Sequence, residues 1–177
     1  LRSLPEREFI NGMAEVWKYA FIMDAPMVET LSAKTWSTIS TDLPALIERC
    51  VRHKAAVVME DEFETLGRRS ILNFGHTIGH GIERMLGYRD LLHGEAIAIG
   101  MVVAARIAHG MGMLRAEPVH RITRLLERFG LPTHLPKADP GVLMSLMDTD
   151  KKAEAGKVRF VLPSAIGRVE ITSAVTR

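Results

Sequence analysis

The sequence predicts a mainly α-helical domain that ends in a short β-hairpin. Through most of the 177 residues, apolar side chains recur every three or four positions, which is the spacing of one buried helix face. Aromatic residues make up only 6%, whereas the helix-forming residues Ala, Leu, Met, Glu and Arg are abundant. Strand-like alternation of apolar and polar residues is confined to two short segments near the C-terminus.

Residues that favour helix ends divide the helical part into segments. Asn11 can cap the first helix, and Pro44 suits the first turn of the third. Pro118 opens a later helix, and Gly130 with Pro132 ends it. The expected helices cover residues 11–24, 27–35, 43–58, 71–86, 95–109, 118–129 and 140–147, and the expected strands cover 157–162 and 167–172.

Two of these helices have an unusual composition. The segment 71–86 contains Gly75, Gly79 and Gly81, and each glycine costs a helix interior about 1 kcal/mol relative to alanine. Close approach of another backbone would explain why they are there. The segment 95–109 is apolar on nearly every face, so we expect it at the centre of the domain.

Charge and cysteine content exclude several classes of protein. Lys and Arg number 23 against 21 Asp and Glu, so no strong positive field favours a nucleic acid or an anionic membrane as partner. The single cysteine, Cys50, excludes an internal disulfide framework and a Cys-rich zinc site. The longest apolar stretch, 96–108, contains Arg106 and is too short to cross a bilayer. With no signal-peptide pattern visible, we expect a cytoplasmic protein.

Histidines near the middle of the chain point to a metal site. His76 and His80 are four residues apart, so on a helix they share one face at a spacing that suits a common metal ion. His93 follows shortly afterwards, and Glu15 lies in an apolar helix, where a carboxylate needs a partner. Histidine and glutamate ligands with one open position are typical of catalytic zinc. The spacing alone equally allows histidines that are satisfied by hydrogen bonds.

A set of cationic residues suggests an anionic substrate. Phosphate or carboxylate groups are the natural ligands of lysine and arginine side chains beside a metal ion. Each of these residues taken singly could instead be a solvated surface charge. The candidates are Lys18, Lys54, Arg69, Lys151 and Lys152.

Three long motifs resemble the 3-dehydroquinate synthase family. They are GMAEVWKY at 12–19, ILNFGHTIGHGIE at 71–83 and LHGEAIAIGM at 92–101, and DKK at 150–152 and FVLP at 160–163 also match. The resemblance covers nearly the whole chain. It implies the fold of the family's C-terminal domain, so that residues 1–177 form one helical metal- and substrate-binding domain. The N-terminal NAD-binding domain of the family is expected to be absent from this chain and to act as its partner.

The resemblance also implies roles for individual residues. Glu15, His76 and His93 match the three metal ligands, in place of the pair His76 and His80 that spacing alone suggests. Counting back from Asn73 makes Arg69, rather than Arg68, the match to the family's substrate-binding arginine. Either Lys151 or Lys152 could face the site. The positions that match substrate-binding residues are Lys18, Lys54, Arg69, Asn73, His80 and Lys152.

The implied activity is a carbocycle-forming phosphate lyase of the shikimate pathway, which leads to aromatic amino acids. Its substrate is a sugar-acid phosphate, 3-deoxy-D-arabino-heptulosonate 7-phosphate, and its products are 3-dehydroquinate and phosphate. NAD+ would oxidise a ring hydroxyl, phosphate would leave by β-elimination, the hydride would return, and an aldol step would close the carbocycle. The implied cofactors are NAD+ and a divalent ion, zinc or cobalt, and the implied assembly is a homodimer. Without a hydride acceptor, the chain alone should turn over nothing.

The sequence also allows other interpretations. A related sugar-phosphate cyclase shares the scaffold, as, more distantly, do enzymes like glycerol dehydrogenase. A non-catalytic helical module could have kept the fold without the activity. A metalloprotease is disfavoured, because Thr77 and Ile78 follow His76 where the HExxH motif needs a glutamate.

Overall fold

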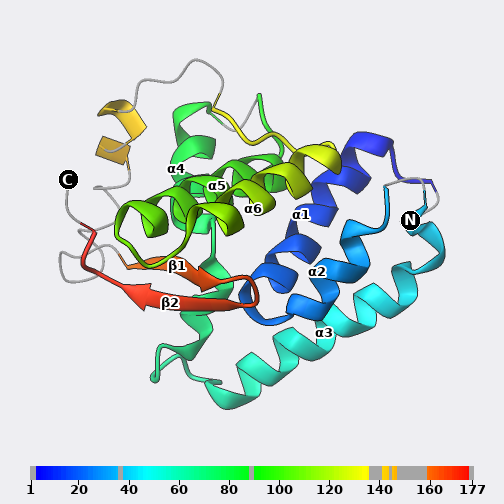
Figure 1. The fold of residues 1–177 in the computed structure, drawn as a ribbon, viewed down its shortest axis with the longest axis horizontal. Helices are drawn as coiled ribbons and strands as arrows, with labels where there is room; N and C mark the ends of the chain where they lie inside the picture. Colours follow the sequence, from blue (N-terminus) through cyan, green and yellow to red (C-terminus); the bar gives the residue numbers. More distant parts are fainter. Residues whose placement is uncertain are drawn as a thin grey trace.

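The computed structural model describes residues 3–35, 38–87, 90–135, 141–143, 145–146 and 159–175. In this part the chain is mostly helical and ends in a two-stranded antiparallel hairpin, as the sequence predicts (Figure 1). None of the described helices is long and apolar enough to cross a membrane. The elements are α1 (Glu6–Met23), α2 (Ala25–Ser32), η1 (Ile39–Thr41), α3 (Leu43–Glu60), η2 (Arg68–Asn73), α4 (His76–Met85), α5 (His93–Gly110), α6 (Ala116–Arg128), β1 (Phe160–Ala165) and β2 (Arg168–Thr172).

The apolar helix α5 forms the centre of the domain. It packs against α1, α4, α6 and β1, and Figure 1 shows α6 running alongside it. The consecutive residues Ala96, Ile97, Ala98 and Ile99 are all buried, although they point in different directions around the helix. The prediction that this segment lies at the core is therefore confirmed.

Glycines allow the backbones of α4 and α5 to touch. A Cβ atom added to Gly100 would lie 2.1 Å from the carbonyl oxygen of Gly75. A Cβ atom on Gly79 would lie 2.6 Å from the Ile97 side chain and 3.2 Å from its Cα atom. The predicted close approach is confirmed at Gly75 and Gly79, and for the buried Gly81 it stays a prediction.

The predicted helix 71–86 is confirmed over 76–85, but its first residues belong to a separate 3-10 helix. The 3-10 helix η2 ends at Asn73 and α4 begins at His76, and between them Gly75 adopts a left-handed conformation with φ +78°. The apolar pattern continues across the break, so periodicity alone does not reveal it. The break makes His76 the first residue of α4.

The predicted cap of the first helix is wrong. Pro5 precedes α1, and Asn11 lies within that helix. The Asn11 side chain instead accepts a hydrogen bond from the first turn of α5. The second helix begins earlier than expected, since the Asp24 carboxylate accepts a hydrogen bond from Met27 N at 3.0 Å and caps α2.

Helix α3 lies at the edge of the fold and buries only part of its apolar stripe (Figure 1). Pro44 occupies the first turn, as predicted, and Leu46 and Val57 are buried. Ile47 and Val51, which share the helical spacing of the core residues, are 44% and 61% exposed.

The hairpin covers one side of α5. Phe160 and Leu162 of β1 are buried, and β1 pairs in antiparallel register with β2. Pro163 lies inside β1, opposite Val169, so the turn is shorter than predicted. Of the expected helix 140–147, residues 141–143 and 145–146 are helical. The remainder of that helix and residues 157–158 of the expected strand lie outside the described residues.

Candidate metal centre

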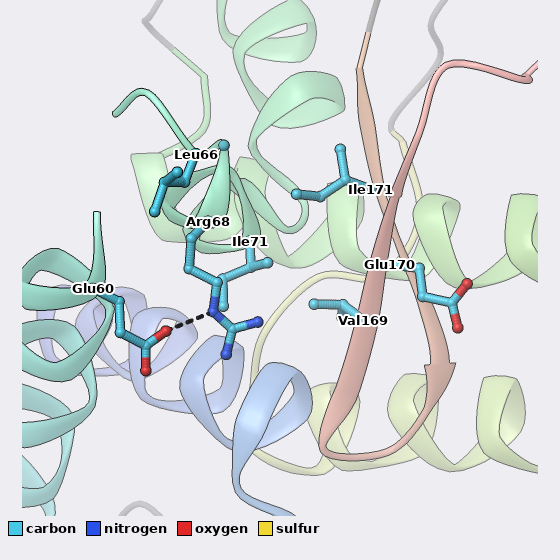
Figure 2. Close-up of a pocket in the computed structure, with 8 residues that line it drawn as sticks. Glu60, Leu66, Arg68, Ile71, Val169, Glu170 and Ile171 are labelled. Atoms are coloured by element: carbon cyan, nitrogen blue, oxygen red, sulfur yellow. Dashed lines mark hydrogen bonds and ion pairs between the residues drawn. The ribbon is translucent and has the colours of Figure 1, made fainter. Parts of the chain in front are cut away.

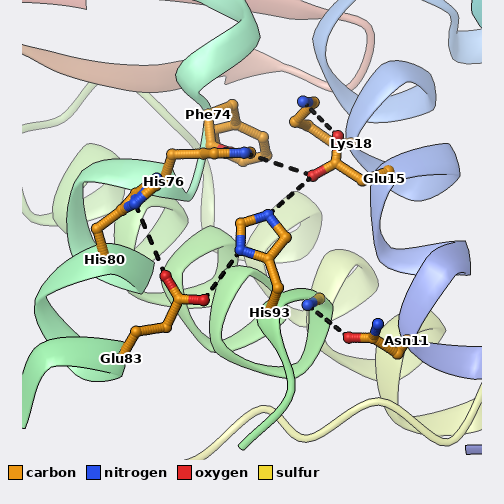
Figure 3. Close-up of polar contacts among 9 residues, drawn as sticks. Asn11, Glu15, Lys18, Phe74, His76, His80, Glu83 and His93 are labelled. Carbon is orange, nitrogen blue, oxygen red and sulfur yellow. Dashed lines mark hydrogen bonds and ion pairs between the residues drawn. The ribbon is translucent and has the colours of Figure 1, made fainter. Parts of the chain in front are cut away.

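Three side chains from three different helices converge at one point. Glu15 comes from α1, His76 from the start of α4 and His93 from the start of α5. The Glu15 Oε1 atom lies 3.4 Å from His76 Nε2 and 3.8 Å from His93 Nε2 (Figure 3). One ligand atom from each residue lies within 4.8 Å of the others, so a single ion could reach all three.

Helix α1 is joined to the start of α5 close to this point. The Asn11 Oδ1 atom accepts a hydrogen bond of 2.6 Å from Gly94 N, so Asn11 satisfies a free N–H group in the first turn of α5 (Figure 3). A Cβ atom on Gly94 would lie 2.0 Å from the Asn11 carbonyl oxygen. Asn11 is one helical turn before Glu15, and Gly94 is next to His93, so this contact sets the separation between the two candidate ligands.

Hydrogen bonds to both histidines leave the same ring atom available. His76 Nδ1 lies 3.1 Å from the carbonyl oxygen of Phe74, and His93 Nδ1 lies 3.0 Å from Glu83 Oε1. When each Nδ1–H donates to its oxygen, the lone pair is on Nε2, which faces Glu15. Burial, followed by the positive charge of Lys18, lowers the pKa of His76. His76 is thereby held in the neutral form that binds metals.

The Glu15 carboxylate has one oxygen that accepts a hydrogen bond and one that accepts none. Its Oε2 atom accepts a hydrogen bond of 2.6 Å from the buried ammonium group of Lys18. Its Oε1 atom is shielded from solvent and has no hydrogen-bond partner. A buried carboxylate oxygen without a partner is unfavourable. A divalent cation between Oε1 and the two imidazoles would remove that cost.

The donor set fits a divalent transition metal. Two imidazole nitrogens and one carboxylate oxygen form the His2Glu ligand set of catalytic zinc sites, which leave a fourth position open. Within the part of the chain that the structure describes, Glu15, His76 and His93 are the group of potential metal ligands whose ligand atoms all lie within 4.8 Å of one another. This is the set implied by the resemblance, rather than the pair His76 and His80 suggested by spacing alone.

His80 lies beside the cluster. It is one turn after His76 on α4, is exposed, and its ring centroid is 5.5 Å from that of His76 and 5.9 Å from that of His93. Lys18 also lies at the cluster, through its contact with Glu15. These two residues are thus placed where a group bound to the metal could meet them.

The other predicted substrate-binding residues lie on neighbouring elements. Lys54 and Asn73 are exposed, on α3 and at the end of η2, and these two elements pack against each other. Arg69 Nη1 donates to the carbonyl oxygen of Glu62 at 3.3 Å. Lys151 and Lys152 lie outside the described residues. The substrate-binding roles of these residues remain predictions.

A separate open pocket of about 800 Å³ lies between η2 and β2 (Figure 2). Arg68, the alternative to Arg69, is found here and donates to Glu60 Oε2 at 3.0 Å. None of the three candidate metal ligands lines this pocket. The residues that line it are Glu60, Leu66, Gly67, Arg68, Ile71, Val169, Glu170 and Ile171.

Sequence reasoning did not identify Asn11, Gly94 and Glu83 as parts of this site. Gly94 and Glu83 lie inside the conspicuous motifs, but each makes its contact with a different helix: Gly94 with Asn11 of α1, and Glu83 with His93 at the start of α5. Asn11 has the residue type of a helix cap, and it does cap a helix, although not its own.

Comparison with curated proteins shows extensive similarity to one group of enzymes. The chain is 46% identical over 181 residues to the 3-dehydroquinate synthase of a Synechococcus species. The alignment covers 99% of this chain but only 49% of that protein. Against the 3-dehydroquinate synthase of Nostoc punctiforme, the identity is 48% and the coverage is 99% of this chain and 50% of that protein. The chain therefore spans about half the length of the curated relatives it matches.

Solved structures of two related synthases share the fold. A 2-epi-5-epi-valiolone synthase from Streptomyces hygroscopicus, with NAD+ and Zn2+ bound, superposes with a TM-score of 0.85 at 25% identity, over 98% of this chain and 49% of that one. A 2-deoxy-scyllo-inosose synthase, complexed with carbaglucose-6-phosphate, NAD+ and Co2+, gives a TM-score of 0.81 at 29% identity, over 97% and 49%. The family described as 3-dehydroquinate synthase C-terminal matches residues 12–153. The chain belongs to this family.

Proposed function

We propose that this chain is the metal- and substrate-binding part of a 3-dehydroquinate synthase. The observation that carries the proposal is the meeting of Glu15 Oε1 with His76 Nε2 and His93 Nε2, with Oε1 buried and lacking a hydrogen-bond partner. A site of this kind serves chemistry in which a hydroxyl oxygen gains negative charge.

The three ligands would hold a zinc or cobalt ion. When bound, the ion acts as a Lewis acid toward a substrate oxygen. The single negative charge of Glu15 leaves a divalent site with a net positive charge. Lys18 holds the Glu15 carboxylate in place through Oε2, so that Oε1 stays directed at the two imidazoles. The exposed His80 ring beside the cluster is placed to donate to or accept from a substrate hydroxyl.

The cationic residues suit a substrate that carries a phosphate and a carboxylate. We assign binding of these groups to residues on α1, α3 and η2 and to the DKK motif, with either lysine of that motif as the contact. A phosphorylated sugar analogue in the related inosose synthase supports this substrate class. The assigned residues are Lys18, Lys54, Arg69, Asn73 and Lys152.

The choice among reactions of this fold rests on similarity to curated proteins. Identity to 3-dehydroquinate synthases is 43–48%, whereas identity to the valiolone and inosose synthases of known structure is 25–29%. The substrate we propose is therefore 3-deoxy-D-arabino-heptulosonate 7-phosphate. The second candidate is a cyclase that acts on another sugar phosphate.

The remaining components follow from the length of the relatives. Since the chain spans about half of them, we propose that it works with an NAD-binding domain and that residues 1–177 are one helical domain. NAD+ bound to a related synthase supports the cofactor assignment. A cytoplasmic homodimer is the assembly we propose.

A chimera tests the proposal. This chain would replace the C-terminal half of the Synechococcus 3-dehydroquinate synthase, and release of phosphate from the heptulosonate phosphate would be measured with NAD+ and Zn2+. The intact Synechococcus enzyme is the positive control, and this chain alone, without a domain that holds NAD+ beside the substrate, should release none. Turnover of sedoheptulose 7-phosphate or glucose 6-phosphate instead would favour the second candidate. A folded chimera inactive on all three would contradict the enzymatic assignment.

A further inference from the structure

Glu83 divides its carboxylate between two histidines at the edge of the metal centre. Glu83 lies on α4 and is only 8% exposed to solvent. Its Oε1 atom lies 3.0 Å from His93 Nδ1, and its Oε2 atom lies 3.7 Å from His80 Nδ1 (Figure 3). We propose that Glu83 is a positioning residue, which orients His93 for metal binding and holds His80 next to it. This inference rests on the proposed metal site.

Burial makes these contacts necessary. A carboxylate at this depth needs compensating partners. In the described part of the chain, the side chains found in contact with the Glu83 carboxylate are the two imidazoles, with no lysine or arginine among them. The two imidazole rings therefore supply the polar contacts that compensate for burial of the Glu83 carboxylate.

The contact with His93 selects the tautomer that can bind a metal. A carboxylate that accepts the Nδ1 proton keeps the lone pair on Nε2 and fixes the orientation of the ring. In this structure His93 Nε2 faces Glu15 Oε1 at 3.8 Å, as a ligand must. The backbone carbonyl oxygen of Phe74 does the same for His76. Of the two oxygen atoms that accept from the ligand histidines, only that of Glu83 is charged.

The position of Glu83 on α4 joins the two parts of the site. His76, His80 and Glu83 are spaced four and three residues apart, so they lie on one face of the helix. Glu83 reaches from α4 to the first residue of α5. One side chain thus fixes a metal ligand on α5 relative to the exposed histidine on α4.

Titration of the chain with Co2+ tests this role without any measurement of activity. The dissociation constant and the visible absorption of bound Co2+ would be measured for the wild type, Glu83→Gln and Glu83→Ala. Loss of a carboxylate that supports a ligand histidine weakens metal binding by about 10- to 100-fold. We expect a loss in this range for Glu83→Gln, a larger loss for Glu83→Ala, and a changed spectrum in both.

Glu127→Gln is the matched control. Glu127 is also a carboxylate shared between two side chains, since it accepts from Thr133 Oγ1 at 2.6 Å and lies 3.9 Å from His134 Nδ1, but it lies on α6. It should bind Co2+ like the wild type. Unfolding of each metal-free variant separates lost affinity from lost stability.

Each outcome bears on a different statement. Unchanged Co2+ affinity and spectrum in both Glu83 variants would overturn the positioning role and leave the metal site intact. A wild type that does not bind Co2+ would overturn the metal site itself, and the role of Glu83 with it.

Discussion

Substitution of Gly94 by alanine should damage both the stability and the metal affinity of the chain. The new Cβ atom would lie 2.0 Å from the carbonyl oxygen of Asn11 and 2.8 Å from its Oδ1 atom. The nearest atom belongs to the backbone of α1 and cannot rotate away, so α1 and the start of α5 must separate by about 1.4 Å to reach the 3.4 Å of an ordinary van der Waals contact.

The size of the effect follows from the two opposing terms. Overpacking of this kind costs about 1–3 kcal/mol, and the upper end applies where backbone must move. The higher helix propensity of alanine relative to glycine stabilises the helix by at most about 1 kcal/mol. The net loss in the free energy of unfolding is therefore about 2 kcal/mol. Because Glu15 and His93 flank this contact and metal ligands must be placed to about 0.2 Å, Zn2+ affinity should fall by at least 10-fold.

Denaturant unfolding followed by circular dichroism, together with Zn2+ titration by calorimetry, measures both effects. Gly12→Ala is the control, because Gly12 lies next to Asn11 in α1 but has no atom within 4 Å of an added Cβ atom. It should raise stability by up to about 1 kcal/mol and leave Zn2+ affinity unchanged. Wild-type stability and affinity in Gly94→Ala would show that the contact between α1 and α5 does not position the ligands.

Three further predictions concern single charged or ionisable residues. Glu15→Gln removes the negative ligand while keeping its shape, and calorimetry should show Zn2+ affinity reduced by at least about 100-fold; an unchanged affinity would place the metal elsewhere. Burial would raise the pKa of Asp24, but hydrogen bonds from Arg49 and His53 outweigh it and lower the pKa. The stability that this carboxylate contributes is thus complete above its unfolded pKa of about 3.9 and is lost as the pH falls through the lower folded pKa. Asp24→Asn should lower the free energy of unfolding at pH 7 by about 3 kcal/mol and flatten its acid dependence, and equal pH profiles for the two proteins would contradict this. Burial raises the pKa of the Cys50 thiol to about 11, with Asp24 and Glu15 adding to the effect. At pH 8 a disulfide reagent should therefore react with Cys50 about 100-fold more slowly than with a free cysteine, and a rate equal to that of free cysteine would mean that the thiol is not shielded.

Helical periodicity predicts the fold where the pattern reports burial directly. The apolar helix α5 lies at the core as expected, because apolar residues on all faces leave no side for solvent. The same reasoning fails for α3, where Ile47 and Val51 follow the core spacing but remain exposed. Periodicity identifies an apolar face, but it does not identify what packs against that face.

The break before His76 shows a second limit. Gly75 allows a left-handed turn that ends η2 and starts α4, yet glycine also occurs inside α4 at Gly79 and Gly81. Local sequence does not say which glycine turns the chain and which one makes room for α5. That choice depends on the contact between Gly75 and Gly100, which are 25 residues apart in sequence.

The candidate metal centre needs both sequence motifs and tertiary contacts. Residue types alone favour His76 with His80, because two histidines one turn apart share a helix face. The structure instead brings Glu15 and His93 to His76 through the contacts between α1, α4 and α5. Only the resemblance to a family indicates this set from sequence, since the three residues lie on separate helices.

Diffraction from crystals grown with Zn2+, recorded at the zinc absorption edge, tests the central claim most directly. We expect one anomalous peak per chain, bonded to a Glu15 carboxylate oxygen, His76 Nε2 and His93 Nε2 at about 2.0–2.2 Å. Zinc held by His76 and His80 without Glu15, or no zinc between these three side chains, would contradict the account.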